Sequence, residues 1–552
     1  MIKFREYNQD QGLALPPYLE EMIDKNHLVR VINRLVDCIP IENLAAKFSS
    51  NKHNQGGNRP YHPKMILKVL IYAYATGVYT SRKIAKQLRE NVNFMWLSGM
   101  QKPDFRTINR YRSNYLLEVF PQVFSEVLYV LSDKKLLDLN TVFIDGTKLA
   151  ADCNKHKVVW KKNVERYKAK LRVRVDRMFS EIAALDAEEM KRYGDLDLPE
   201  RGKQSKLTSD DLQEASSNIS KALEVDGKSS HNKTGQKLRK TAYQLKEDSK
   251  KLKRYDQQSK DLGSRNSISK TDTEATVMKM KNEELRPGYN VQAVTSGDFI
   301  VSTCVTQNAN DGSSLPPVMQ RYKESGLSHP QRLVADAGYG HEEVYNYLET
   351  EGITAYVKYP SYYAEKSNEA KYQYHYSKFT YLEAEDVFVC PQGKKLYFVD
   401  TSEDQSISGY RSQKRIYQCK DCKGCEVKDK CTRSTRGRTL TVNFKLRDYQ
   451  EKVRKRLSTE EGEQLYSERG YRTETIFGEW KHNLKFRRFN LRGLQKVNAE
   501  VILLSLAYNF RKLAKYLGHF PIFCKKVFKK IVIISNYMFP KPILIKAMRK
   551  SA

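Results

Sequence analysis

The sequence predicts an α/β protein in which a helical amino-terminal region precedes a region that contains strands, and three observations point to this class. Apolar residues recur every three or four positions from residue 13 to about 130, a period that indicates amphipathic helices. Short β-branched and aromatic runs appear near residue 140 and return between 288 and 357, and such runs are typical of strands. From about 155 to 265, two long charged stretches of helical character, Val158 to Met190 and Leu238 to Leu262 with a polar break between them, separate the two groups of strands. A last helical region is expected from about 459 to 517.

Length and charge narrow the class of protein further. The chain has 552 residues, enough for several domains, and its 40% of apolar residues exclude a wholly disordered chain. Lysine and arginine total 97 against 65 acids, a net charge of +32 that favours a polyanionic partner, nucleic acid before an acidic membrane. We expect no membrane partner, because no run approaches ~18 apolar residues. Nine cysteines and a start without a secretion signal predict a reducing, cytoplasmic setting.

The amino-terminal region contains a candidate DNA-binding motif. The run Lys64 to Tyr74 predicts a buried helix, Thr80 or Ser81 can cap a second helix over 82–90, and Asp104 can cap a third. The third helix carries Arg106, Asn109 and Arg110. A short helix, a turn and a basic helix fit a helix-turn-helix that enters a DNA groove. A plain helical bundle with a solvated basic face is the alternative.

Three carboxylates form a candidate catalytic set. The strand-like run 141–144 ends at Asp145, and the run 333–335 ends at Asp336. Glu474 lies in a helical stretch, with Lys481 seven residues later on the same face. Carboxylates that converge repel one another unless cations neutralise them, and Mg²⁺ or Mn²⁺ suits such oxygen ligands. Taken alone, either aspartate is an ordinary turn former or helix cap; only the set predicts a two-metal site.

These residues belong to a longer ordered series of motifs. The series comprises Tyr61-His62-Pro63, Phe94 to Gly99, Thr107 to Arg110, Ile144 to Thr147, Gly288 to Gln292, Ala335 to Tyr339, Glu474 to Lys481, Arg487-Arg488-Phe489 and Arg492-Gly493. In this order it resembles the DDE transposases of bacterial insertion sequences, the IS1182 group in particular, within an IS4/IS5-like superfamily. The resemblance covers nearly the whole chain.

The resemblance implies a fold and a chemistry. It implies a ribonuclease-H-like mixed-sheet core, with Asp145 on the first strand, Asp336 on the fourth and Glu474 on a later helix. These three would hold two Mg²⁺ or Mn²⁺ ions for cleavage at transposon ends and joining of the 3′-hydroxyl ends to target DNA. The family signature Tyr-x2-Arg-x3-Glu-x6-Lys also implies DNA contacts by Tyr466, Arg469 and Lys481. Here four residues, not three, separate Arg469 from Glu474.

The cysteines suggest a separate metal site. Five of them cluster in one irregular, glycine-containing region: Cys390, Cys419, Cys422, Cys425 and Cys431. Four of the five could bind one structural Zn²⁺ in tetrahedral geometry. Free thiols or a redox pair are the alternative.

The expected organisation follows from these motifs. We expect a helical DNA-binding domain over 1–130 and a catalytic core built from 131–154, 270–361 and 446–517. A charged helical insertion would occupy 155–269, a cysteine-rich insertion 362–445 and a basic tail 518–552. The expected partner is double-stranded DNA, both terminal inverted repeats and target, bound by a homodimer in the bacterial cytoplasm at the nucleoid. A catalytically dead repressor or architectural protein is the alternative function.

Overall fold

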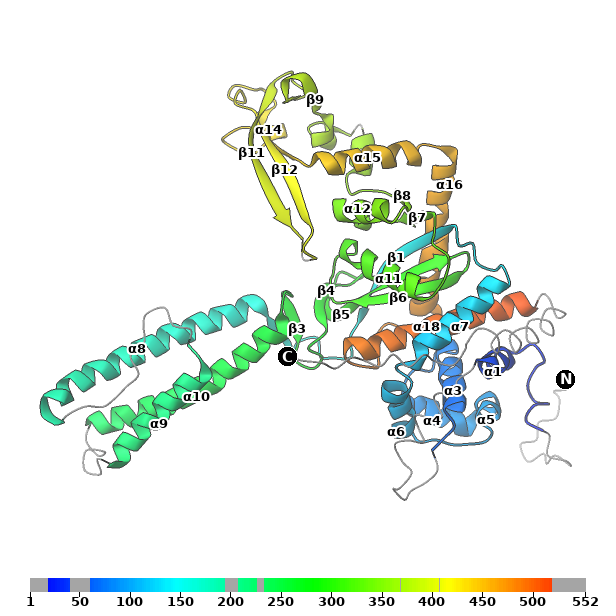
Figure 1. Ribbon diagram of the computed structural model, residues 1–552, viewed down its shortest axis with the longest axis horizontal. Helices are drawn as coiled ribbons and strands as arrows, with labels where there is room; N and C mark the ends of the chain where they lie inside the picture. The colour runs from blue at the N-terminus through cyan, green and yellow to red at the C-terminus, as the bar shows by residue number, and fades with distance from the viewer. Residues whose placement is uncertain are drawn as a thin grey trace, which may run out of the picture. The chain divides into compact units, whose positions relative to one another are not determined.

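The computed structural model describes residues 18–39, 60–193, 207–225, 233–367, 369–406 and 408–518 (Figure 1). The chain divides into two compact units, one formed by residues 1–149 and 290–552 and the other by 150–289. The basic tail expected from 518 onward lies, apart from its first residue, outside the described residues. Within those ranges, no helix is long and apolar enough to cross a lipid bilayer.

A mixed sheet forms the centre of the first unit. Its strands are β1 (Thr141–Ala150), β5 (Leu285–Ser296), β6 (Phe299–Thr306), β7 (Arg332–Ala335) and β8 (Thr354–Val357). They lie in the order β6–β5–β1–β7–β8, with β5 and β6 antiparallel and β1, β7 and β8 parallel to one another. The predicted mixed α/β class is confirmed, and the arrangement is consistent with a ribonuclease-H-like core. Asp145 lies on the first of these strands and Asp336 follows the fourth.

Helices cover this sheet. They are α11 (Leu315–Glu324), α12 (Glu342–Thr350), α15 (Phe444–Leu457), α16 (Glu460–Arg469) and α18 (Leu494–Gly518). Helices α11 and α18 both pack on β6, while α12, α15 and α16 pack along β7 and β8 (Figure 1). Helices α11 and α18 therefore cover β6, and α12, α15 and α16 cover the parallel strands β7 and β8. Strand β1 lies between these two parts of the sheet.

The amino-terminal region is helical, as predicted. Its helices are α1 (Leu28–Cys38), α3 (Pro63–Ala75), α4 (Ser81–Glu90), α5 (Val92–Leu97), α6 (Phe105–Arg110) and α7 (Val119–Asp133). The predicted caps are present, because the side chains of Thr80 and Asp104 accept hydrogen bonds from the N–H groups of Lys83 and Thr107. Helix α6 continues into a π-helical turn, Tyr111–Tyr115.

A buried carboxylate joins these helices to α18. Glu500 is fully buried, and its carboxylate accepts hydrogen bonds from the Tyr74 hydroxyl at 2.8 Å and from the N–H groups of Asn490 and Leu491 at 2.9 and 3.1 Å. The buried Arg112 guanidinium donates to the same tyrosine hydroxyl at 3.1 Å. Burial raises the pKa of Tyr74 well above its usual value, so the hydroxyl remains a donor. One charged group on α18 thus satisfies polar atoms from α3 and from the loop that precedes α18.

The second unit contains the charged helices expected as an insertion. Its helices are α8 (Lys161–Tyr193), α9 (Ser209–Val225) and α10 (Lys233–Leu262). In the chain they follow the short strand β2 (Val158–Trp160) and precede the short strands β3 (Ser267–Ser269) and β4 (Thr276–Lys279). We expected the first helix to begin at residue 158, but the β-branched pair Val158-Val159 instead pairs with β3. Helix α9 replaces an expected break, since Leu212, Ala215 and Ile219 pack on α8 and α10 despite the polar composition around them.

The cysteine-rich region is a sheet rather than irregular chain. It contains β9 (Thr380–Leu382), β10 (Val387–Val389), β11 (Lys395–Gln405), β12 (Arg411–Gln418) and β13 (Thr439–Val442), with short helices α13 (Tyr362–Lys366) and α14 (Lys428–Cys431). The strands form one antiparallel sheet in the order β13–β12–β11–β10–β9. Strand β11 is exposed along most of its length and β12 is half-buried over much of its length, so their sequences lack the alternation of apolar and polar residues that would have predicted them.

The last helical region, expected over 459–517, is interrupted. After α16 come a π-helical turn (Gly470–Glu474), α17 (Thr475–Gly478) and a second π-helical turn (Glu479–Asn483). Residues 484–493 are not helical, and Lys485 and Gly493 have positive φ. The backbone leaves the helix here because Tyr79 of the amino-terminal region donates to the carbonyl of Leu484 at 2.7 Å.

The substitution Glu500→Ala tests the buried connection. It removes the acceptor of several buried donors, and we expect it to lower the free energy of unfolding by about 3–5 kcal/mol. Urea denaturation followed by circular dichroism measures this change. The matched control is Glu463→Ala on α16, an exposed glutamate whose loss should cost no more than about 1 kcal/mol. Equal midpoints for the two variants would contradict the role given to Glu500.

Candidate active site

Strand pairing brings two of the predicted carboxylates together. Strands β1 and β7 run parallel in a register that ends at the pair Ile144 and Ala335. Asp145 and Asp336 are the next residues on each strand, and neighbouring strands lie about 4.8 Å apart. We expected Asp145 at a strand end, whereas β1 continues to Ala150 because its other edge remains beside β5. Only the pairing with β7 ends there, which leaves an opening for both side chains.

Each aspartate is oriented by the backbone that follows it. The N–H of Gly146 donates to Asp145 and the N–H of Ala337 to Asp336, both at 2.8 Å. Burial raises the pKa of Asp145 to about 6, the Gly146 hydrogen bond and Arg469 oppose this rise, and Asp336 and Asp311 add to it. Asp336 is 52% exposed. The site therefore contains one half-buried and one exposed carboxylate that repel each other.

Glu474 follows Arg469 across a π-helical turn. An α-helix places Arg469 and a residue four positions later on one face, but Glu474 is five positions later. The turn Gly470–Glu474 is π-helical, and its i→i+5 hydrogen bonds accommodate one extra residue per turn. The π-helical turn thus accommodates the one residue by which the spacing between Arg469 and Glu474 exceeds that of the family signature Tyr-x2-Arg-x3-Glu. Glu474 is exposed, and together with Asp336 and Asp145 it raises the pKa of Arg469, against the effect of burial.

Arg469 lies among the acids without a full set of partners. Its Nη2 is 3.9 Å from Asp336 Oδ1, and its side chain is only 15% exposed. Its Nε is buried and has no hydrogen-bond partner in the described part of the chain. A buried guanidinium N–H without an acceptor is costly unless a ligand or water supplies one. This donor fits an anionic ligand at the carboxylate site.

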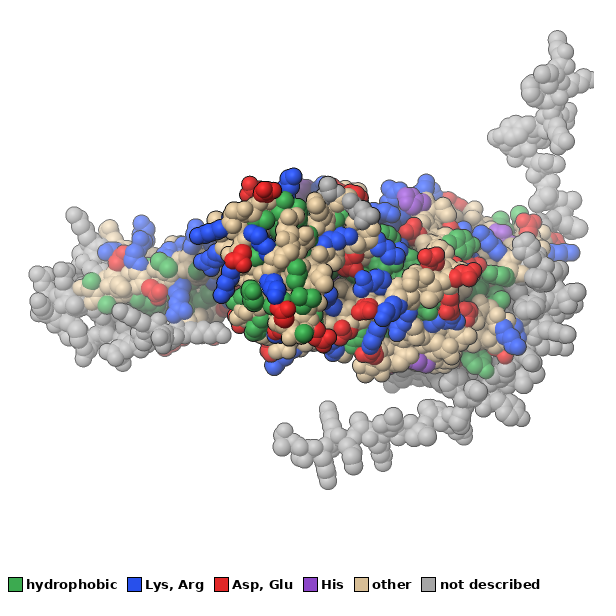
Figure 2. All heavy atoms as spheres, turned by 90° about the horizontal axis from the view of Figure 1, so that it is seen from above, with side chains coloured by type: hydrophobic (Ala, Val, Ile, Leu, Met, Phe, Trp, Pro, Cys, Tyr) green, Lys and Arg blue, Asp and Glu red, His purple; other side chains and the backbone are tan. Residues whose placement is uncertain are grey.

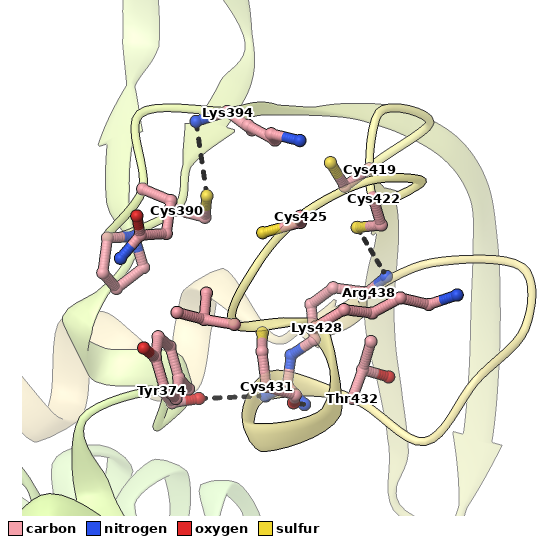
Figure 3. A pocket seen from close by; sticks show the side chains of 13 residues that line it. Tyr374, Cys390, Lys394, Cys419, Cys422, Cys425, Lys428, Cys431, Thr432 and Arg438 are labelled. Atoms are coloured by element: carbon pink, nitrogen blue, oxygen red, sulfur yellow. Dashed lines mark hydrogen bonds between the residues drawn. The ribbon is translucent and has the colours of Figure 1, made fainter.

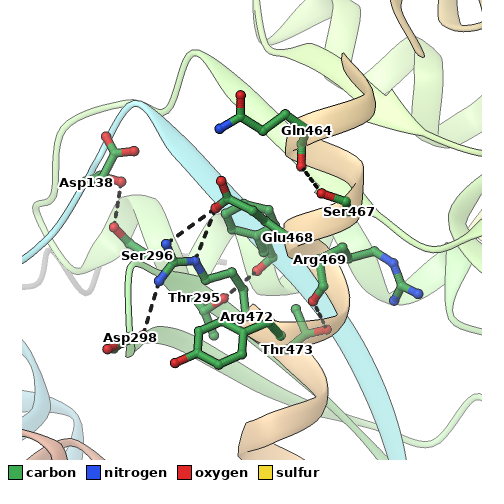
Figure 4. Close-up of polar contacts among 12 residues, drawn as sticks. Asp138, Thr295, Ser296, Asp298, Gln464, Ser467, Glu468, Arg469, Arg472 and Thr473 are labelled. Carbon is green, nitrogen blue, oxygen red and sulfur yellow. Dashed lines mark hydrogen bonds and ion pairs between the residues drawn. The ribbon is translucent and has the colours of Figure 1, made fainter. Parts of the chain in front are cut away.

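A separate arginine fixes the helix that carries these groups. Arg472 donates to Asp298 at 3.1 Å and to Glu468 at 3.4 Å, and Asp298 also accepts from the hydroxyl of Tyr516 on α18 (Figure 4). Asp298 lies in the turn between β5 and β6, where Gly297 has a φ of +57°. Figure 4 shows the Arg469 side chain pointing away from this cluster. The π-helical turn is therefore held against the sheet on one side and presents Arg469 on the other.

Tyr466 and Lys481 also lie beside the site. The ammonium group of Lys358 lies 3.8 Å from the centre of the Tyr466 ring, and the Arg469 guanidinium lies 5.6 Å from it. Lys481 Nζ donates to the hydroxyl of Thr147, two residues after Asp145 on β1. Lys481 therefore lies beside β1, and Tyr466 lies beside Arg469.

The sequence analysis missed a fourth acid, Asp311. It follows β6, and its Oδ1 accepts hydrogen bonds from Asn290 at 2.7 Å and Gln292 at 3.1 Å, both fully buried on β5. A Cβ atom at residue 146 would lie 2.4 Å from Gln292 Nε2 and 2.8 Å from Asp311 Oδ1, so a larger residue here would force these side chains to shift. The signal was present, because Asp311-Gly312 repeats the Asp-Gly pair of Asp145-Gly146.

The five clustered cysteines surround one cavity of about 20 Å³ (Figure 3). All five are free thiols: Cys390, Cys419, Cys422, Cys425 and Cys431. Backbone N–H groups of Lys394 and Arg438 donate to the sulfurs of Cys390 and Cys422 at 3.3 and 3.4 Å. Cys419 differs from the others, because it is almost completely buried, and burial raises its pKa to about 11. Soft thiolate ligands around a small cavity suit Zn²⁺ in chemical terms.

Over the described ranges, no three His, Cys, Asp or Glu side chains are gathered closely enough to hold a metal ion. At the carboxylate site, the donor chemistry nevertheless fits a hard cation. Asp145, Asp311 and Asp336 present oxygen donors and repel one another, and Arg469 is the cation that offsets them.

The predicted DNA-reading residues lie on the surface of α6. Arg106, Asn109 and Arg110 are exposed, although the Asn109 amide oxygen accepts a hydrogen bond from Arg112 at 3.1 Å. Arg106 and Arg82 both lie over the ring of Phe105. Elsewhere on the surface, Figure 2 shows Lys and Arg side chains spread over the visible face with acidic side chains among them. Helices α4 and α6 pack together, an arrangement that suits either of the two alternatives raised by the sequence.

Two parts of the chain match the models of known protein families. Residues 389–514 match the model of a transposase DDE domain, and residues 17–114 match a transposase domain, DUF772. The chain carries the domain pair of a DDE transposase. This pairing is typical of IS1182-type transposases. No curated protein matches the chain.

The matched regions cover part of the candidate site of this transposase. The DDE match contains Tyr466, Arg469, Glu474, Lys481 and the five clustered cysteines. It begins beyond Asp145 and Asp336, which the register of β1 and β7 brings together. The DUF772 match contains α6 with its exposed arginines.

The substitution Gly146→Ala tests the close contact beneath Asp145. The added methyl group would overlap Gln292 and Asp311, so we expect a loss of about 1–3 kcal/mol in the free energy of unfolding. Thermal denaturation measures it. The control is Gly470→Ala, since a Cβ at residue 470 meets no other atom within 4 Å and should be neutral or stabilising. A Gly146→Ala variant as stable as the control would contradict the contact.

Proposed function

We propose that this transposase cuts DNA at the ends of an insertion sequence and joins the freed 3′-hydroxyl ends to target DNA. The observation that supports this most is the register of β1 and β7, in which Asp145 and Asp336 follow the last paired residues of two parallel strands. Glu474 would complete the set, and its carboxylate, like those of Asp336 and Asp145, raises the pKa of Arg469. A DDE transposase domain match over the same helix agrees with it.

The roles of the individual residues follow from their surroundings. Asp145, Asp336 and Glu474 would hold Mg²⁺ or Mn²⁺, which, when bound, activates the attacking oxygen and stabilises the leaving oxygen in phosphoryl transfer. The buried Nε of Arg469 would donate to a phosphate oxygen of the strand being cut. Lys481 and Tyr466, on either side of Arg469, would position the same strand.

A different part of the chain from the carboxylate site would recognise the DNA. We assign it to α6, where Arg106, Asn109 and Arg110 are exposed and could read the terminal inverted repeats from a groove. A homodimer would pair the two ends, each bound by one copy. The reaction would take place in the bacterial cytoplasm, at the nucleoid.

The cysteine-rich sheet would carry a structural Zn²⁺. Cys390 and Cys422 accept backbone hydrogen bonds at their sulfurs, and Cys425 and Cys431 line the same cavity. The buried Cys419 lies in the aromatic core of the sheet and is the one we leave out.

The substitution Asp145→Asn separates chemistry from binding. It retains the size of the side chain but removes the charge that holds a divalent ion, so cleavage of labelled transposon ends should fall to the level seen in EDTA. DNA binding, measured by mobility shift, should remain nearly unchanged, because α6 is untouched. The variants Asp336→Asn and Glu474→Gln should show the same loss of cleavage and the same retained DNA binding. Variants that combine two of these substitutions should lose little more cleavage than the single variants.

The control for that experiment is Glu324→Gln, an exposed acid on α11 that should cleave as the unmodified chain does. Mg²⁺-dependent cleavage by Asp145→Asn would contradict the assignment. Binding without any cleavage by the unmodified chain would instead favour the repressor or architectural alternative.

Zinc analysis tests the cysteine site. Purified protein should contain about one Zn²⁺ per chain, and Cys422→Ser should lose it and lower the thermal stability of the chain. Cys38→Ser, a change in the partly exposed cysteine of α1, should retain the metal. A full chain that contains no zinc after purification and does not bind added Zn²⁺ would leave five free thiols instead.

A further inference from the structure

The inference concerns Asp311, the acid between β6 and α11 that neither the motifs nor the family matches assign. Its Oδ1 accepts from both buried amides of β5, Asn290 and Gln292. Its Oδ2 accepts none of the hydrogen bonds found among the described residues. Two buried amides thus fix a carboxylate by one oxygen and leave the other available.

The position of this carboxylate is set by two glycines. A Cβ at Gly146 would lie 2.8 Å from Asp311 Oδ1, and a Cβ at Gly338 would lie 3.5 Å from Asp311 Oδ2. Gly146 directly follows Asp145, and Gly338 lies two residues after Asp336. The side chain of Asp311 therefore lies between the two backbone segments that present the predicted catalytic aspartates.

A hydrogen-bonded relay connects Asp311 to the second of these segments. Gln292 donates to Asp311 from Nε2 and accepts from the hydroxyl of Tyr339 at Oε1. Tyr339 is almost completely buried in the turn that Asp336 begins. The Gln292 amide also donates to Asn290 Oδ1 at 3.1 Å, so loss of the acceptor at Asp311 would remove one of the two hydrogen bonds that orient the partner of Tyr339.

The charge balance indicates what this arrangement attracts. Asp145, Asp311 and Asp336 face one region, Arg469 is the nearest cation, and Lys481 lies beside Thr147. Three carboxylates close together destabilise one another, and a divalent cation relieves that repulsion more than any one arginine does. An acid held here by buried amides is therefore placed to strengthen the attraction of the site for a cation.

We propose that Asp311 is a positioning residue of the carboxylate site: its charge strengthens divalent metal binding by Asp145 and Asp336, and its hydrogen bonds to Gln292 hold the turn that presents Asp336. The proposal rests on the metal-dependent function proposed above. It differs from a purely structural role, in which Asp311 would serve only as acceptor for two buried amides.

The substitution Asp311→Asn distinguishes the two roles in the full-length chain. Asparagine retains an acceptor for Asn290 and Gln292 but removes the charge. We expect thermal denaturation in EDTA to give a midpoint equal to or above that of the unmodified chain, because a repulsive charge has been removed. Titration with Mn²⁺ alone should then require about 10–100-fold more metal to reach half of the stabilisation. Cleavage of transposon ends should show the same shift in Mn²⁺ dependence.

The control is again Glu324→Gln, which should leave the midpoint and the metal dependence as they are. A fall of the Asp311→Asn midpoint by equal amounts in EDTA and in Mn²⁺ would overturn the proposal in favour of the structural role. An unchanged Mn²⁺ dependence, or a full-length chain that Mn²⁺ does not stabilise at all, would also overturn it. Metal stabilisation without DNA cleavage by the unmodified chain would refute the proposed function alone, since the Mn²⁺ titration still decides the role of Asp311.

Discussion

The pairing of β1 with β7 is the constraint on which the candidate site depends. Four register pairs hold these strands parallel, and the pairing stops at Ile144 and Ala335. If the register slipped by one residue, Asp145 would turn to the opposite face of the sheet, because side chains alternate along a strand. The continuation of β1 beside β5 prevents the strand from bending away at this point. Three further features of the site depend on this register: the turn after Asp336, the hydrogen bonds of Gln292 to Asp311 and Tyr339, and the contact of Arg469 with Asp336.

The helix that carries Glu474 shows how the chain accepts an extra residue without losing the site. An insertion in an α-helix rotates everything after it by about 100°. Here the π-helical turn Gly470–Glu474 absorbs that rotation. The hydrogen bonds of Arg472 to Glu468 and Asp298 secure the helix on both sides of the irregularity. A departure from the expected spacing is thereby reconciled with an unchanged set of neighbours.

Sequence reasoning predicted the features that local chemistry determines. The caps at Thr80 and Asp104, the strand 354–357 and the hairpin of β5 and β6 depend on residues close in the chain. Sequence reasoning failed where contacts between residues far apart in the chain determine the structure. Strands β11 and β12 pair through exposed polar residues, and α9 is stabilised by α8 and α10 rather than by its own composition. Asp311 escaped notice because its significance comes from Asn290 and Gln292, on another strand.

The burial of Glu500 has a consequence for how such proteins diversify. Because its carboxylate satisfies donors from α3 and from the loop after the Glu474 helix, the DUF772 region is not a detachable module. Exchange of residues 17–114 with those of a relative would leave a buried charge facing foreign side chains, unless α18 were exchanged as well. Arg511 of α18 adds to this dependence through the carbonyl of Ala75 and the carboxylate of Glu479. DNA recognition and catalysis would then be inherited together, so that new end sequences arise by substitutions on the surface of α6 rather than by recombination of whole domains.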